Sequence, residues 1–205
     1  MEMHAASAPP SLTERLARFS ASLTFDSLPE AVAHQAHRCL LDTTGAMIAG
    51  SRLSQAGQAG RRLAAGLDER GDAAVAGSTI SRSPMTAALV NGMASHALEL
   101  DDGSKHATYH PGASIVPAAL ALGQAKRISG RKLVEAVVAG YEVSLRIGTA
   151  INPGHYLRGF HPTGTIATFG TTAASAKILG LDAETTANAF GLAGSLASGI
   201  NQYEI

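Results

Sequence analysis

The sequence predicts an all-α protein, a multi-helix bundle of Ala/Gly-rich helices. Hydrophobic residues make up 45% of the 205 residues and charged residues only 16%. Apolar residues recur at spacings of three and four along most of the chain, which is the helical period. Just one short run, AAVAGS at residues 73–78, has the character of a strand, too little for a sheet. Aromatic residues are 4% and Trp is absent, so small side chains must let the helices pack closely.

The first half of the chain contains two clear helix starts. Ser11 and Glu14 have capping-box spacing and precede apolar residues at steps of four, which predicts a short amphipathic helix. Pro29 suits the first position of the next helix, and we expect that helix to end at Gly50.

The second half is predicted to be helix after helix. Ser83 and Pro84 form an N-cap followed by proline, and we expect the helix they begin to continue to Asp102. The later helices are expected to begin near Ser114, after Gly130, at Thr163 or Thr165, and after Asp182, with Gly180 ending the third of these four.

The chain length suits one domain with its own core, at residues 11–205, preceded by a disordered tail at residues 1–10. The start of the chain lacks the basic and apolar segments of a secretory signal. Cys39 is the single cysteine, so no internal disulfide forms and a buried, inert thiol is favoured. We therefore expect a cytoplasmic protein.

Charge excludes two classes of partner. The formal net charge is zero, with no basic stripe for nucleic acid and no polybasic segment for an anionic membrane. No apolar stretch reaches the length of about 20 residues that a membrane span needs. The low charge fits a surface covered by another copy of the chain.

The stretch ALELDDGSKHATYHPG, residues 97–112, holds an unusual density of titratable groups. His96, Glu99 and Asp102 are spaced three apart and would share one face of a helix, while Asp101 would point elsewhere unless the helix has already unwound. Neighbouring carboxylates raise one another's pKa, and nearby cations lower it, so such groups can exchange protons near neutral pH. A charged helix end followed by a solvated loop is the alternative interpretation.

Two short segments share a pattern. HPGAS at residues 110–114 and HPTGT at residues 161–165 each place His-Pro, a glycine and a hydroxyl residue before a helix. Proline keeps the preceding residue out of the helical region, so His110 and His161 should each lie ahead of a helix N-terminus. Two such N-termini, each with an imidazole beside it, predict a receptor for a carboxylate-bearing ligand.

The second of these segments belongs to a polar cluster, NPGHYLRGFHPTGT at residues 152–165. Its glycines let backbone approach a ligand, and Arg158 could bind a carboxylate through two parallel hydrogen bonds. A flexible surface loop is the alternative. No HExxH, no cysteine pair and no phosphate-binding glycine motif occurs, so we expect no metal, no cofactor and no nucleotide.

Longer segments resemble one family. NGMASHALELDD, HPGASIVPAALALGQ, GRKLVEAVVAGYEVSLRIG, GFHPTGTIATFGTTAASAKILGLD and AFGLAGSLASGINQ, in this order, are similar to the MmgE/PrpD family. The resemblance runs from about Leu28 to the last residue. That family contains 2-methylcitrate dehydratases, cis-aconitate decarboxylases and an iminodisuccinate epimerase.

The resemblance implies a metal-free enzyme that handles small di- or tricarboxylates. It implies a helical domain, a smaller lid domain with the active site between the two, and a homodimer formed through the helical part. By motif, His110 and His161 match the family's active-site histidines and Asp101 and Asp102 its paired aspartates. Glu99 stands where the family often has Asp, and Ser104 is a candidate for a hydroxyl position there.

These observations lead to a hypothesis about the reaction. We expect a lyase of the 2-methylcitrate dehydratase type that transfers protons next to a carboxylate, and decarboxylation or epimerisation are the alternatives within the family. His110 or His161 would be the acid or base, with Glu99 and Asp102 tuning or orienting them. Lys105, Arg158 and the two helix N-termini would bind the substrate carboxylates, and Asp101 and Ser104 are further candidates for substrate binding.

One departure from the family leads to an alternative. The family's lysine and lid lie beyond the part that this sequence resembles, so we expect a truncated form of the family's helical domain. A helical dimerisation module without catalysis is the alternative from another class, and a metal-dependent hydrolase is a third.

Overall fold

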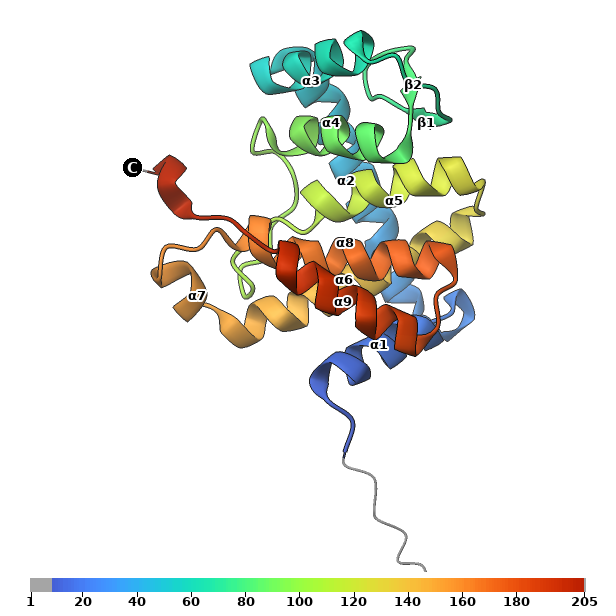
Figure 1. Ribbon diagram of the computed structural model, residues 1–205, viewed down its shortest axis with the longest axis vertical. Helices are drawn as coiled ribbons and strands as arrows, with labels where there is room; N and C mark the ends of the chain where they lie inside the picture. The colour runs from blue at the N-terminus through green and yellow to red at the C-terminus, as the bar shows by residue number, and fades with distance from the viewer. Residues whose placement is uncertain (1–8, 205) are drawn as a thin grey trace, which may run out of the picture.

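The computed structural model describes residues 9–204, and this part of the chain is a bundle of α-helices (Figure 1). The predicted fold class is confirmed. The elements, in chain order, are α1 (Leu12–Ser22), η1 (Phe25–Ser27), α2 (Glu30–Leu53), α3 (Gln55–Gly66), β1 (Ala73–Ala74), β2 (Ser81–Arg82), α4 (Pro84–His96), α5 (Gly112–Lys126), α6 (Gly130–Ile151), α7 (Gly154–Leu157), α8 (Pro162–Leu179), α9 (Ala183–Leu196) and η2 (Asn201–Glu204).

The helices are stacked along the long axis of the molecule. α3 and the two short strands lie at one end and α1 at the other, with α5, α6 and α8 between them (Figure 1). α6 packs on α8, α8 on α5, and α5 on α4, while α2 contacts α3, α4, α5 and α6. The core therefore runs continuously through helices that are far apart in the sequence.

Small residues make this packing possible. A Cβ at Gly50 of α2 would overlap the carbonyl of Ala94 in α4, and a Cβ at Gly140 of α6 would lie 2.8 Å from the carbonyl oxygen of Gly170 in α8. At both places the helix backbones touch, and glycine alone fits. The side chains around the second crossing include Ile115, which is completely buried, and truncation to alanine at such a site typically costs about 2–5 kcal/mol.

Several helix starts are as the sequence predicts. The Ser11 hydroxyl accepts from the Glu14 N–H, and the Glu14 carboxylate accepts from the Ser11 N–H at 2.7 Å, so the capping box is present. Ser83 caps α4 with Pro84 in its first turn. Asp182 caps α9 through the Thr185 N–H.

Other boundaries were predicted wrongly. α2 continues past Gly50 to Leu53, because this part of the helix packs against α4 and α3, where Gly50 is a contact residue and not a cap. α4 ends at His96 and does not reach Asp102. AAVAGS contributes two residues to a minimal antiparallel hairpin, Ala73–Ala74 against Ser81–Arg82.

Two expectations concern the ends and surface of the chain. The expected disordered tail lies outside the described residues except for Pro9 and Pro10, which are exposed and precede α1. Across residues 9–204, none of the helices combines the length and the apolar character needed to cross a lipid bilayer.

Candidate functional site

A polar cavity of about 610 Å³ lies between the loop after α4 and the start of α8. The sequence places its candidates about 50 residues apart, yet His110 and His161 both line this cavity. Glu99, Ser104 and Lys105 line it as well. The structure thus brings together five of the eight predicted site residues.

The loop that forms one wall is held in place by its own short contacts. The Ser104 N–H donates to the Tyr109 carbonyl at 2.9 Å, and the Ser104 hydroxyl accepts from the Ala107 N–H. Tyr109 is buried, and its hydroxyl donates to Ser144 Oγ of α6 at 2.5 Å. The loop is thus held both by hydrogen bonds within itself and by the bond from Tyr109 to α6. It can therefore position His110, which follows Tyr109 directly.

The histidine pair at the cavity wall is organised by Asp101, whose side chain is 0% exposed. The Nδ1 atom of His96 lies 3.1 Å and 3.2 Å from the two Asp101 carboxylate oxygens. The Nδ1 atom of His110 lies 3.4 Å from the nearer one. The two rings are 4.8 Å apart, centre to centre. Because an ionised carboxylate can only accept, it favours the proton of His96 on Nδ1 and leaves Nε2 directed elsewhere.

The Asp101 carboxylate changes the acidity of His96. The hydrogen bond with Asp101 raises the pKa of His96 above its ordinary value, and this effect outweighs burial, which acts in the opposite direction. Sequence reasoning placed His96 on a helix face and did not count it as a site residue. The signal that could have found it is its spacing of five residues from Asp101, which becomes a contact only because the helix ends between them.

Asp102 lies on the other side of the loop and does not line the cavity. Its carboxylate accepts from the Gly112 N–H at 2.8 Å and from the Tyr141 hydroxyl at 2.8 Å. Burial raises the pKa of Asp102, and these two hydrogen bonds partly offset that effect. Its contacts make Asp102 a cap for α5 that is tied to α6.

Two expectations are corrected by this geometry. His96, Glu99 and Asp102 do not share a helix face, because α4 ends at His96 and Glu99 has φ of 52°. It is Asp101 that turns toward the histidines. The N-terminus of α5 is also not open to a ligand carboxylate, because the Asp102 carboxylate already accepts from its first N–H.

The second His-Pro segment forms the opposite wall. His161 is the N-cap residue of α8, and its N–H donates to the Gly199 carbonyl at 3.1 Å. Thr163, in the first turn of α8, accepts at its hydroxyl from the His110 N–H at 3.2 Å. This bond joins the two segments directly.

The remaining predicted residues differ in position. Lys105 is exposed and lines the cavity. Arg158 is exposed at the end of α7 and does not line it, so the structure does not support the expected contact with substrate. Tyr156, two residues earlier, lines the cavity instead. The short α7 turns the arginine away and the tyrosine inward.

The described residues contain one group of side chains that could hold a metal ion. His96, Glu99 and His110 each offer one ligand atom, and these atoms lie within 4.8 Å of one another.

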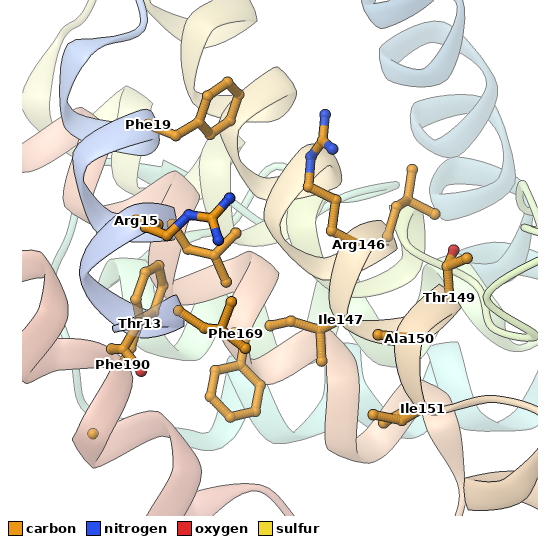
Figure 2. Close-up of a pocket in the computed structure, with 14 residues that line it drawn as sticks. Thr13, Arg15, Phe19, Arg146, Ile147, Thr149, Ala150, Ile151, Phe169 and Phe190 are labelled. Carbon is orange, nitrogen blue, oxygen red and sulfur yellow. The ribbon is translucent and has the colours of Figure 1, made fainter. Parts of the chain in front are cut away.

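A larger apolar cavity, of about 1020 Å³, lies between α1, α6, α8 and α9 (Figure 2). Phe169, Phe190 and Ile147 line it, and its charged groups are Arg15 and Arg146. Arg146 is paired with Glu142 at 2.7 Å. With no acid or base group in its lining, this cavity is a poor candidate for proton transfer, and size alone does not identify the site.

Comparison with known proteins agrees with the resemblance read from the motifs. Residues 14–204 match the model described as the MmgE/PrpD N-terminal domain. The chain is 30% identical over 203 residues to a cis-aconitate decarboxylase-like protein of Aspergillus oryzae, covering 94% of this chain and 42% of that protein. It is 31% identical over 196 residues to the human cis-aconitate decarboxylase, covering 91% of this chain and 40% of that protein. The corresponding enzyme of Aspergillus terreus is 27% identical, with 92% and 40% covered. The chain thus spans about two fifths of the length of these relatives.

Proposed function

The chain belongs to the MmgE/PrpD family, and we propose that it forms the helical part of a lyase that acts on small di- or tricarboxylates. The observation that carries this proposal is that two imidazoles, His110 and His161, line one polar cavity of about 610 Å³. That volume lies within the usual range for small-molecule sites. Sequence analysis put dehydration of a 2-methylcitrate-like substrate first. The relatives described above are cis-aconitate decarboxylases or a protein like them, which favours decarboxylation of a cis-aconitate-like acid, and we propose that reaction.

Decarboxylation needs a group that delivers a proton to carbon. The bond between a carbon and its carboxyl group breaks, carbon dioxide leaves, and the electron pair stays on the carbon. A neighbouring double bond and carboxylate spread this charge, and a protonated imidazole then donates its proton to carbon. His110 is suited to this role because it lines the cavity, and because the Asp101 carboxylate lies 3.4 Å from its Nδ1 while its Nε2 lies on the side of Glu99.

Binding of the substrate carboxylates is assigned to groups on both walls. Lys105 supplies a positive charge, and the Tyr156 side chain lies at the same cavity. The N-terminus of α8 adds the partial positive charge of a helix start, since α8 begins at Pro162 within the cavity wall. Asp101 acts through the histidines and Asp102 through α5, so both are positioning residues in this proposal.

Titration calorimetry of this chain with cis-aconitate tests the proposal. We expect saturable binding that His110→Ala and His161→Ala each weaken by at least tenfold, because each removes a cavity wall group. His106→Ala is the matched control, since His106 is an exposed residue of the same loop that does not line the cavity. Where carbon dioxide release is measured, loss of the proton donor should lower turnover by about 10²–10⁴-fold. Cis-aconitate binding that is unchanged in both His110→Ala and His161→Ala would contradict the proposal.

We also propose that the chain self-associates. The supporting observation is that large apolar side chains stand on its surface: Leu41, Met85 and Leu196 are each at least 75% exposed, on three different helices. Light scattering after size-exclusion chromatography should give the mass of a dimer. A dimer that binds none of the carboxylates tested would favour the alternative of an association module without catalysis, and a monomer would contradict self-association.

A further inference from the structure

The cluster at the back of the polar cavity has the composition of a metal site. The Nε2 atom of His96 lies 3.6 Å from one Glu99 carboxylate oxygen, and the Nε2 atom of His110 lies 3.9 Å from the other. Two imidazoles and one carboxylate are the ligand set of many zinc sites that keep one position open. Zinc–ligand bonds of about 2.0–2.2 Å bring the ligand atoms of a tetrahedral site to roughly 3.3 Å apart. The two His–Glu separations are close to that geometry, and the three ligand atoms, which lie within 4.8 Å of one another, would have to move closer together around an ion.

Asp101 fixes the orientation of the His96 ring by hydrogen bonds to its Nδ1 and lies beside the Nδ1 of His110. Asp101 is fully buried at its side chain and contacts the Nδ1 atoms of His96 and His110, at 3.1 Å and 3.4 Å. Both Nε2 atoms are then left toward Glu99 and the cavity. A carboxylate that holds the far nitrogen of a ligating histidine is the usual support of a metal site. A chance group of charged surface side chains would not be expected to have such a supporting carboxylate.

The third ligand depends on an unusual backbone conformation. Glu99 has φ of 52°, in the left-handed region that costs a residue with a side chain on the order of 1–3 kcal/mol. Glu99 lies three residues beyond the end of α4, and its carboxylate lies near both histidines. Its side chain is 70% exposed, so the charge stays hydrated while no ion is bound.

We propose that His96, Glu99 and His110 bind one divalent transition-metal ion of the zinc type, with the open coordination position facing the cavity. Imidazole and carboxylate together favour such an ion over magnesium or calcium, which prefer oxygen ligands alone. A bound ion occupies the nitrogen of His110 that faces the cavity. The consequence for activity rests on the proposed function: an ion that holds His110 stops proton transfer, so zinc acts as an inhibitor of the lyase. Metal binding itself does not rest on that function.

Calorimetric titration of this chain with zinc chloride in substrate-free buffer tests the site. We expect one saturable site per chain. His96→Ala and Glu99→Gln should each weaken it by at least tenfold through loss of a ligand, and Asp101→Asn should weaken it by about 10–100-fold through loss of support. His106→Ala is the matched control and should bind zinc like the unaltered chain. Circular dichroism establishes that each variant is folded.

A pair of variants separates this proposal from the proposed function. His161→Ala should lose cis-aconitate binding and keep the zinc site, whereas Glu99→Gln should lose the zinc site. Cobalt(II) gives a second readout, since ligation by two imidazoles and a carboxylate produces visible absorption that must vanish in His96→Ala. The absence of saturable zinc binding, or zinc binding by His96→Ala and Glu99→Gln as strong as that of the unaltered chain, would overturn the proposal.

Discussion

The two His-Pro segments have nearly the same sequence pattern, but they are anchored in different ways. In the first, the Asp102 carboxylate accepts from the Gly112 N–H at the start of α5, and Tyr141 holds that carboxylate from α6. In the second, backbone anchors the start of α8: the His161 N–H donates to the Gly199 carbonyl. The start of α5 is thus held by the Asp102 side chain. The start of α8 is held by the backbone at Gly199, between α9 and η2.

This difference decides what each helix start can do. A helix N-terminus attracts any nearby carboxylate. At α5 a carboxylate of the protein itself lies there, so the site contributes rigidity and positions His110. At α8 the first turn lines the cavity with Thr163. The two similar His-Pro motifs therefore predict that a helix begins after each of them. They do not predict which of the two helix N-termini is open to a ligand.

The largest effect that tests this comparison is expected from Gly112→Ala. A Cβ at Gly112 would overlap Thr43 Oγ1 and the Asp102 carboxylate and lie 2.9 Å from the Tyr141 hydroxyl. Overpacking of this kind costs about 1–3 kcal/mol, and displacement of the cap costs about 1 kcal/mol more. Urea denaturation should show this loss in the free energy of unfolding.

Gly164→Ala is the matched variant in the other segment. There a Cβ would meet the Ser198 carbonyl oxygen at 2.8 Å and His161 Nδ1 at 3.3 Å. Because residues 197–200 lie between α9 and η2, outside any helix, they can shift, and the cost should be smaller. If Gly164→Ala destabilised the protein as much as Gly112→Ala, the side-chain cap would not be the stronger anchor.

A smaller effect is expected from Tyr141→Phe, which removes one of the two donors to Asp102. A hydrogen bond to a charged group contributes about 1.5–3 kcal/mol, and the Asp102 carboxylate is partly buried, so solvent replaces the lost donor only in part. Tyr109→Phe is the matched control, because its hydroxyl donates to the neutral Ser144, where about 0.5–1.5 kcal/mol is expected. Thermal unfolding of both variants ranks the two bonds. The reverse order would mean that Asp102 is not held as an ion.

Much of the fold was predictable because the relevant signals are local. Ser11 with Glu14, Ser83 with Pro84, and Asp182 each satisfy N–H groups within three residues, so sequence spacing alone identifies these helix starts. The family resemblance was also predictable from the motifs, and the match over residues 14–204 confirms it.

The candidate site was predictable only in part, because its geometry depends on where α4 ends. A continued helix would place Glu99, one turn on, nearest to His96 and would keep Asp101 away from it, whereas a helix that ends at His96 brings the Asp101 carboxylate to His96. The turn after α4 includes the left-handed conformation of Glu99, and nothing in its residue type signals that conformation. Likewise, the partner of Asp102 is Tyr141, 39 residues away, and only tertiary packing brings them together.

The smallest effect is expected where the two segments meet. The Thr163 hydroxyl accepts from the His110 N–H at 3.2 Å, which is the direct bond between the α8 start and the His110 backbone. Thr163→Ala removes the acceptor from a position that is nearly buried, and a single neutral hydrogen bond contributes about 0.5–1.5 kcal/mol. Thr163→Ser keeps the hydroxyl and should restore the stability. Calorimetry with cis-aconitate adds a second readout: because the bond sets the separation of the two histidines, alanine should weaken ligand binding more than serine does. Equal binding by both variants would mean that the two His-Pro segments hold their positions independently, each by its own anchor.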